Sequence, residues 1–194
     1  MGRRKRRKAP QATAGKDRLG EFAHYPNTIH GIGIISFRCP LPKMQQAVVE
    51  TMLKLNGREE PRQISVSGHQ GEVEGRIGFE VGIANGTFFD NLDVITASEL
   101  IQYLASNSNC RILDFLLVAT YHYRRGGKML PVRFDHHHIR FSFEEGAMGV
   151  TIHHARGTRR LPLDELFQII LEELRRRAER ERLGEVKIEA MRTL

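Results

Sequence analysis

The histidines are the residues whose type and spacing most directly suggest chemistry. Five of the nine in the chain stand in two groups, at positions 136–138 and 153–154. Adjacent residues of a strand point to opposite faces of a sheet, so one metal ion cannot take His137 and His138 together. If the two groups lie on paired strands joined by a tight turn, His138 and His153 face each other across the hairpin.

These two imidazoles are the only metal candidates that this register offers, and two ligands are too few for a stable site. Asp135 is the nearest carboxylate in sequence, but on a regular strand it points away from the face of His138. We therefore expect His138 and His153 to pack as cross-strand polar neighbours, with no bound metal and no cofactor. A metal or ligand site on this histidine-rich hairpin is the alternative.

The strongest charged feature is a run of six basic residues near the start of the chain: Arg3, Arg4, Lys5, Arg6, Arg7 and Lys8. Residues 1–18 hold eight Lys or Arg and one acid, so the whole net charge of +7 lies there. If each of the six charges met a phosphate, the salt dependence of binding to duplex DNA would have a slope of about −5. This favours a nucleic-acid tether, with a solubilising tail, a nuclear-import signal or an acidic protein partner as alternatives.

A second group of cations follows the last histidines. Arg156, Arg159 and Arg160 crowd a loop that leads into a helix N-terminus, where backbone amides also favour anions, so we take them as phosphate candidates. The later arginines at 175–177 alternate with glutamates, which predicts ion pairs between neighbouring turns of a solvated helix.

Motifs for nucleotide binding or hydrolysis are absent from the sequence. The segment His30-Gly31-Ile32-Gly33 lacks the third glycine of a dinucleotide fingerprint, since Ser36 stands in its place. There is also no GxxxxGK[ST], HExxH or GxSxG pattern. The loop from Phe88 to Asp93 is either a hydrophobic plug with a solvated rim or a small-ligand or partner loop. No enzyme class is indicated.

The elements that must position these residues follow from periodicity and turn signals. Apolar residues at three- and four-residue intervals predict helices over 44–55 and from Pro162 to Gly184. The sequence Thr96-Ala97-Ser98-Glu99 resembles a capping box and predicts another helix start. Strands are expected at 29–37, 63–67, 72–84, 112–123, in the histidine-rich hairpin and at 186–190. The two glycines of the first strand suggest close approach by another backbone.

Two turns set the expected registers. A turn at Gly126-Gly127 pairs Tyr123 with Leu130 and Ala119 with Phe134. A second turn at Glu145-Gly146 pairs His137 with His154, and places the following residue pairs on one apolar face: Phe143 with Met148, Phe141 with Val150, and Ile139 with Ile152. His137 and His154 then belong to the core side.

The order of elements predicts an α+β fold: a mainly antiparallel, twisted sheet of about six or seven strands with three helices packed on it. We expect residues 1–25 to form a disordered basic arm and residues 26–194 to form a single α+β domain. No apolar run is long enough for a transmembrane helix, and the start lacks the apolar segment of a secretory signal.

Two cysteines, Cys39 and Cys110, far apart and without a CxxC motif, fit a reducing compartment. We therefore expect a cytoplasmic protein, or a nuclear one if the cell has a nucleus. The leading hypothesis is a non-enzymatic accessory protein that engages nucleic acid or a ribonucleoprotein through its basic arm, while the neutral body serves partner contact or homo-oligomerisation. Its alternatives are a ligand-binding protein or enzyme using the histidines, and a structural assembly subunit whose tail only solubilises it.

Overall fold

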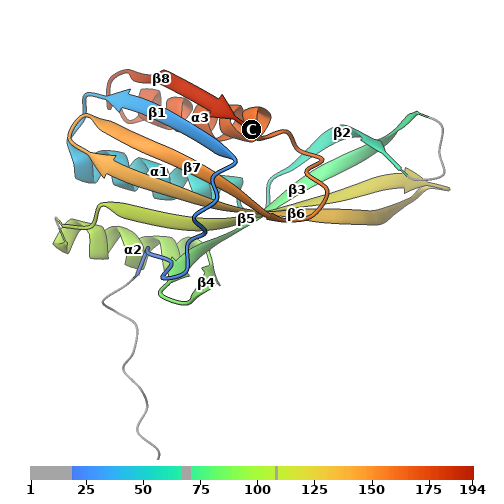
Figure 1. The fold of residues 1–194 in the computed structure, drawn as a ribbon, viewed down its shortest axis with the longest axis horizontal. Helices are drawn as coiled ribbons and strands as arrows, with labels where there is room; N and C mark the ends of the chain where they lie inside the picture. The colour runs from blue at the N-terminus through green and yellow to red at the C-terminus, as the bar shows by residue number, and fades with distance from the viewer. Residues whose placement is uncertain (1–18, 67–70, 108) are drawn as a thin grey trace, which may run out of the picture.

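The computed structural model describes residues 19–66, 71–107 and 109–194, which form eight strands and three helices. Figure 1 shows the elements in chain order: β1 Gly31–Phe37, α1 Leu41–Leu55, β2 Glu59–Ser65, β3 Glu72–Asn85, β4 Phe88–Asn91, α2 Val94–Ser106, β5 Ile112–Arg125, β6 Lys128–Glu144, β7 Ala147–Arg156, α3 Leu163–Arg180 and β8 Val186–Thr193. The predicted α+β class, with a mainly antiparallel twisted sheet and three helices, is confirmed.

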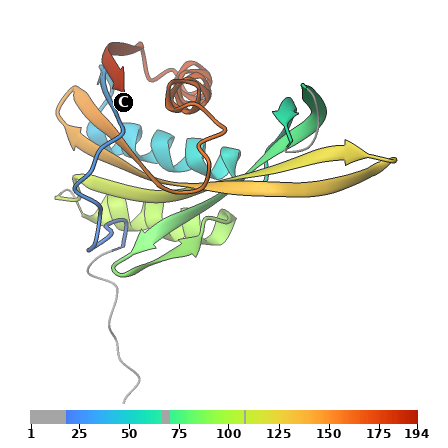
Figure 2. The same ribbon diagram turned by 45° about the vertical axis from the view of Figure 1, so that its right-hand side comes forward.

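The strands form one sheet in the order β2-β3-β5-β6-β7-β1-β8, and β4 pairs with the end of β3. The three helices cover one face, with α1 in contact with both α2 and α3. At the other end of the sheet, the β2–β3 and β5–β6 hairpins project beyond the helices, as Figure 2 shows. The sheet therefore has a helix-covered half and a projecting half.

Strict alternation along β6 and β7 builds the core of the covered half. Phe141 pairs with Val150 and His137 with His154, as the sequence predicts. Phe141 and Val150 are both buried beneath the helices. Because side chains of a strand alternate between faces, His138 and His153 pair on the opposite, open face.

The glycines of β1 make room for an aromatic ring. A Cβ atom added at Gly31 or Gly33 would lie 3.0 Å from the ring of Phe167 on α3. The sequence predicted close approach of another backbone at these glycines, and the structure corrects this to a side chain. The Phe167 ring can approach β1 closely because Gly31 and Gly33 carry no side chain.

The N-terminus of α2 differs from the predicted capping box. The helix begins at Val94, and the N-cap residue is Asp93, whose side chain accepts a hydrogen bond of 2.9 Å from the backbone N–H of Thr96. Thr96 therefore lies within the first turn. The predicted capping box made Thr96 the N-cap residue, whereas Asp93, three residues earlier, takes that place and satisfies a free amide of the first turn.

The register between β5 and β6 shifts in the projecting half. Tyr123 pairs with Leu130 as predicted, but a β-bulge lies between this pair and the covered half, so Thr120 pairs with Phe134 and Ala119 with Asp135. The predicted pairing of Ala119 with Phe134 is wrong by one residue. The extra residue lies between Pro131 and Phe134, so Phe134 keeps the alternation of the covered half and lies on the open face, with Asp135 on the helix-covered face.

The chain before β1 packs on the sheet from Leu19 onward. Gly20 bonds through its backbone to Ala84 at the end of β3 and to Asp114 on β5, filling the gap where these two strands part. The Tyr25 hydroxyl then donates toward backbone oxygens of His138 and Thr151 on the open face. Residues 1–18 of the predicted basic arm lie outside the described residues, whereas residues 19–25 contact the sheet. None of the three helices in the described ranges has the length and apolar composition needed to cross a membrane.

Candidate nucleic-acid interface

The tip of the projecting β5–β6 hairpin, residues 122–134, is a basic surface and is called here the basic hairpin. It carries four cations and no carboxylate: Arg124, Arg125, Lys128 and Arg133. No ion pair within the described ranges includes any of them. Gly126 and Gly127 have φ angles of 57° and 78°, which permits the tight turn that brings the two strands together. Four exposed, unpaired cations thus converge on one projection.

The neighbouring hairpin has the opposite charge. The described parts of β2 and β3 at this end of the sheet carry Glu59, Glu60, Glu72 and Glu74 against Arg62 and Arg76. Arg76 pairs with Glu59 at 3.3 Å, and Arg62 pairs with Glu165 of α3. The chain beyond residue 18 is therefore neutral overall, but its β5–β6 hairpin is positive and its β2–β3 hairpin is negative.

An aromatic and cationic cluster lies where the basic hairpin joins the covered half. Phe134 remains 41% exposed, and its ring centroid lies 5.0 Å from that of His136. The guanidinium carbon of Arg156, at the end of β7, lies 5.5 Å from the Phe134 centroid. Burial and the charge of Arg156 lower the pKa of His136, so this imidazole is neutral near pH 7. We call Phe134, His136 and Arg156 the aromatic cluster.

Asp135, the neighbour of Phe134, is completely buried. It accepts hydrogen bonds from the Tyr121 hydroxyl at 2.7 Å and from the backbone amides of Arg159 and Arg160 at 2.8 and 2.7 Å. Burial alone would raise the pKa of Asp135, but the hydrogen bonds from Tyr121 and the two amides outweigh it and lower the pKa. The carboxylate therefore stays charged and fixes the loop after β7 against the bulged strand.

Gly157 allows that loop to approach Asp135. Its φ angle is 114°, and a Cβ atom there would lie 2.2 Å from Asp135 Oδ1 and 2.4 Å from the Phe134 carbonyl oxygen. Both the backbone angle and the close approach require glycine. The same loop directs the Arg159 guanidinium to the Leu194 carbonyl oxygen and the Arg160 guanidinium to the Ser65 carbonyl oxygen. Of the three arginines predicted to contact phosphate, Arg156 is the exposed one without such a backbone partner.

His138 and His153 are cross-strand neighbours, with ring centroids 6.1 Å apart. However, the N-terminal segment covers His138: the Phe22 ring stacks on it at 5.4 Å, and the Phe89 ring lies 5.3 Å away. Burial, followed by the charge of His153, lowers the pKa of His138 to about 4. His153 contacts the Thr28 carbonyl oxygen through Nδ1 at 2.7 Å. These contacts make the pair part of the packing between the N-terminal segment and the sheet.

The other histidine pair, His137 and His154, lies on the helix-covered face of the sheet. His137 is fully buried, and neither of its ring nitrogens has a hydrogen-bond partner within the described part of the chain. Its centroid lies 5.1 Å from that of His154, and burial together with His154 lowers the pKa of His137 to about 3. No group of three or more His, Cys, Asp or Glu side chains in residues 19–66, 71–107 and 109–194 is arranged to hold a metal ion.

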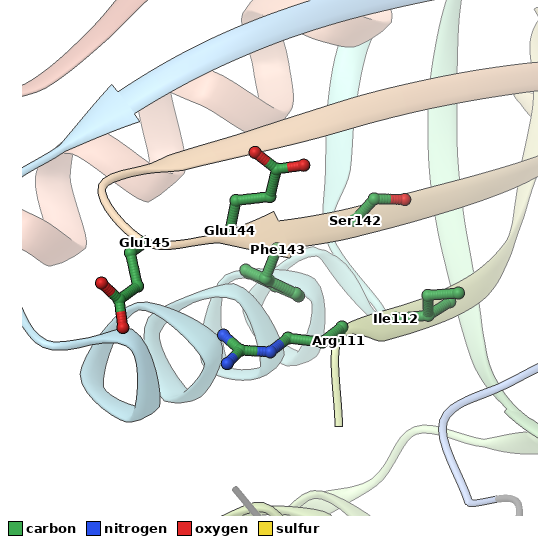
Figure 3. A pocket seen from close by; sticks show the side chains of 6 residues that line it. All are labelled: Arg111, Ile112, Ser142, Phe143, Glu144 and Glu145. Atoms are coloured by element: carbon green, nitrogen blue, oxygen red, sulfur yellow. The ribbon is translucent and has the colours of Figure 1, made fainter. Parts of the chain in front are cut away.

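A surface depression lies at the end of the sheet away from the basic hairpin. It measures about 570 Å³ and is lined by Arg111, Ile112, Ser142, Phe143, Glu144 and Glu145. Figure 3 shows these side chains at the ends of β5 and β6, with Ser142 and Glu144 on one side of the strand and Phe143 on the other. The depression is open and lacks a convergent set of catalytic groups, so it does not define an active site.

Comparison with known proteins gives no assignment: no protein-family model, curated protein or solved structure matches the chain. The first predicted phosphate contacts, at positions 3–8, lie outside the described residues. The four cations of the basic hairpin were not predicted as binding residues, although the segment from Arg124 to Arg133 shows the excess in sequence. The total charge of residues 19–194 does not reveal the basic hairpin, because acidic side chains elsewhere balance its cations.

Proposed function

We propose that the protein is a non-enzymatic nucleic-acid-binding accessory protein whose basic hairpin contacts the phosphate backbone, together with the basic run at positions 3–8. The observation that carries the proposal is the projection of four unpaired cations beyond the helices, without a carboxylate between them. Affinity of proteins for phosphate chains comes mainly from such cations, which displace condensed counterions. Arg156 extends the positive surface toward the covered half.

The test is the salt dependence of binding, measured by fluorescence anisotropy with a labelled oligonucleotide of about 20 nucleotides. Replacing Arg124, Arg125, Lys128 and Arg133 together by alanine should reduce the slope of log affinity against log salt by about 3 on a single strand. The matched control replaces four exposed cations on or beside the helices: Arg38, Lys43, Lys54 and Arg180. This control removes the same total charge and should leave the slope within about one unit of the parent.

Deleting residues 2–18 tests the second half of the proposal. The deletion should weaken binding at about 50 mM salt and reduce the slope by about 4 to 6 on a single strand, because it removes the six-residue basic run together with Lys16 and Arg18. Equal losses from the hairpin and control variants would mean that only overall charge matters, and would contradict a defined interface. Absence of salt-dependent binding by the full chain would contradict nucleic-acid binding altogether and favour an assembly subunit with a solubilising tail.

A further inference from the structure

Regular alternation along β6 gives two adjacent residues an unusual burial. Phe134 shares the open face of His138 and is exposed to solvent, while the charged residue Asp135 lies on the helix-covered face and is fully buried. Large apolar residues are usually buried and carboxylates exposed, so the buried carboxylate needs hydrogen-bond donors. The Tyr121 hydroxyl and the backbone amides of Arg159 and Arg160 are those donors.

The loop after β7 also brings the partners of Phe134 into place. Arg156 ends the strand directly before Gly157, whose close approach to Asp135 brings the loop against β6. The Arg156 guanidinium thereby lies against the exposed ring, with the neutral imidazole of His136 on the same face of the sheet. A planar ring, an imidazole and a guanidinium are thus gathered beside the unpaired cation of Arg133.

We propose that the aromatic cluster is a stacking site for an unpaired base, so that the ligand of the basic hairpin is single-stranded nucleic acid. The inference rests on the proposed function and names its substrate class. Planar aromatic side chains and arginine guanidinium groups stack on bases that are free of a partner strand, whereas the bases of a duplex are already stacked on each other. The flanking cations then hold the phosphates on either side of the stacked base.

The first experiment compares a labelled single-stranded oligothymidine of about 12 nucleotides with a blunt duplex of the same length. Phe134→Ala should lower affinity for the single strand about tenfold and leave affinity for the duplex and the salt slope unchanged, because no charge is removed. Phe134→Tyr keeps the ring and should bind like the parent, whereas Phe134→Leu keeps only apolar bulk and should resemble the alanine variant. Phe88→Ala is the matched control, since Phe88 on β4 is 56% exposed and lies apart from the basic hairpin.

The second experiment uses the absence of tryptophan from the chain. Phe134→Trp creates a single indole whose emission should be quenched when oligothymidine binds, whereas the indole of Phe88→Trp should not respond. Circular dichroism confirms that each variant is folded. A single-strand affinity unchanged in Phe134→Ala, or an indole at 134 that oligothymidine does not quench, would overturn base stacking. Because the charge variants of the basic hairpin test phosphate binding separately, either result would leave the proposed function standing.

Discussion

The helix-covered half of the sheet and its projecting half surround their aromatic and charged side chains differently. In the covered half, Phe141 and Val150 meet under the helices, as alternation requires. In the projecting half, Phe134 faces solvent and Asp135 is buried. The alternation of β6 is continuous from one half to the other, so the difference lies in the partners. Helices cover the apolar side chains of one half, whereas hydrogen bonds satisfy the buried carboxylate at the start of the other.

The largest expected effect is the difference in stability loss between alanine variants of two phenylalanines on β6. Phe141→Ala should reduce the free energy of unfolding by about 3–5 kcal/mol, because it removes buried apolar surface and leaves a cavity. Phe134→Ala should reduce it by less than about 1 kcal/mol, since that ring is largely outside the core. Urea denaturation at neutral pH measures both. Similar losses in the two variants would show that the projecting half is packed like the covered half.

A smaller loss is expected when the buried carboxylate is removed. Asp135→Ala should lower the free energy of unfolding by about 2–4 kcal/mol, because the Tyr121 hydroxyl and two backbone amides lose their acceptor. Asp164→Ala, at an exposed position in the first turn of α3, is the control and should cost less than about 1 kcal/mol. A parent-like midpoint for Asp135→Ala would mean that the carboxylate does not hold the loop after β7 against β6.

Asp135 also has a defined pH dependence. Its pKa in the folded protein lies below its ordinary value, so its charged form stabilises the fold above the unfolded pKa of about 4. That contribution is lost as the pH falls through the lowered folded pKa. The stability difference between the parent and Asp135→Ala should therefore shrink on acidification below about pH 4. A difference that stays constant down to about pH 2 would contradict this assignment.

The smallest expected effect concerns the buried imidazole at the boundary between the two halves. Because the pKa of His137 falls to about 3, its stabilising contribution is complete above its unfolded pKa of about 6.5 and declines as the pH falls below that value. Between pH 7 and pH 5 the parent should lose about 2 kcal/mol more stability than His137→Leu, whose side chain cannot be protonated. Parallel urea midpoints for the two proteins across this range would show that His137 titrates normally.

Sequence patterns predicted the covered half well because the burial of apolar side chains against the helices dominates there. The alternation from His137 to Phe143 and from Met148 to His154 fixes which face meets the helices, so the turn at 145–146 has one acceptable register. The helices followed from their apolar spacing for the same reason. At α2 the start was wrong because Asp93 and Thr96 are both good capping residues, and the choice between them depends on the path of the preceding strand.

The projecting half was less predictable because its register depends on contacts far apart in sequence. Alternation places Asp135 on the helix-covered face, but no local pattern in β6 indicates that the backbone amides of residues 159 and 160 bind it there. The cations from Arg124 to Arg133 are evident in the sequence. Their separation from the glutamates of β2 and β3 appears only in the folded structure. The path of the N-terminal segment over His138 was likewise set by tertiary contacts.

The attachment of Leu19 beside Asn85 has a consequence for avidity. It anchors the tail that carries the basic run: Arg3 lies 16 residues before Leu19, so chain length keeps the run within about 60 Å of that point. A nucleic acid held by the basic hairpin would therefore meet the tail at an effective concentration set by this tether rather than by the amount of protein in solution. Two individually weak electrostatic contacts on one chain would then act as a bivalent binder, and cleavage of the chain before Leu19 would abolish that gain without altering either contact.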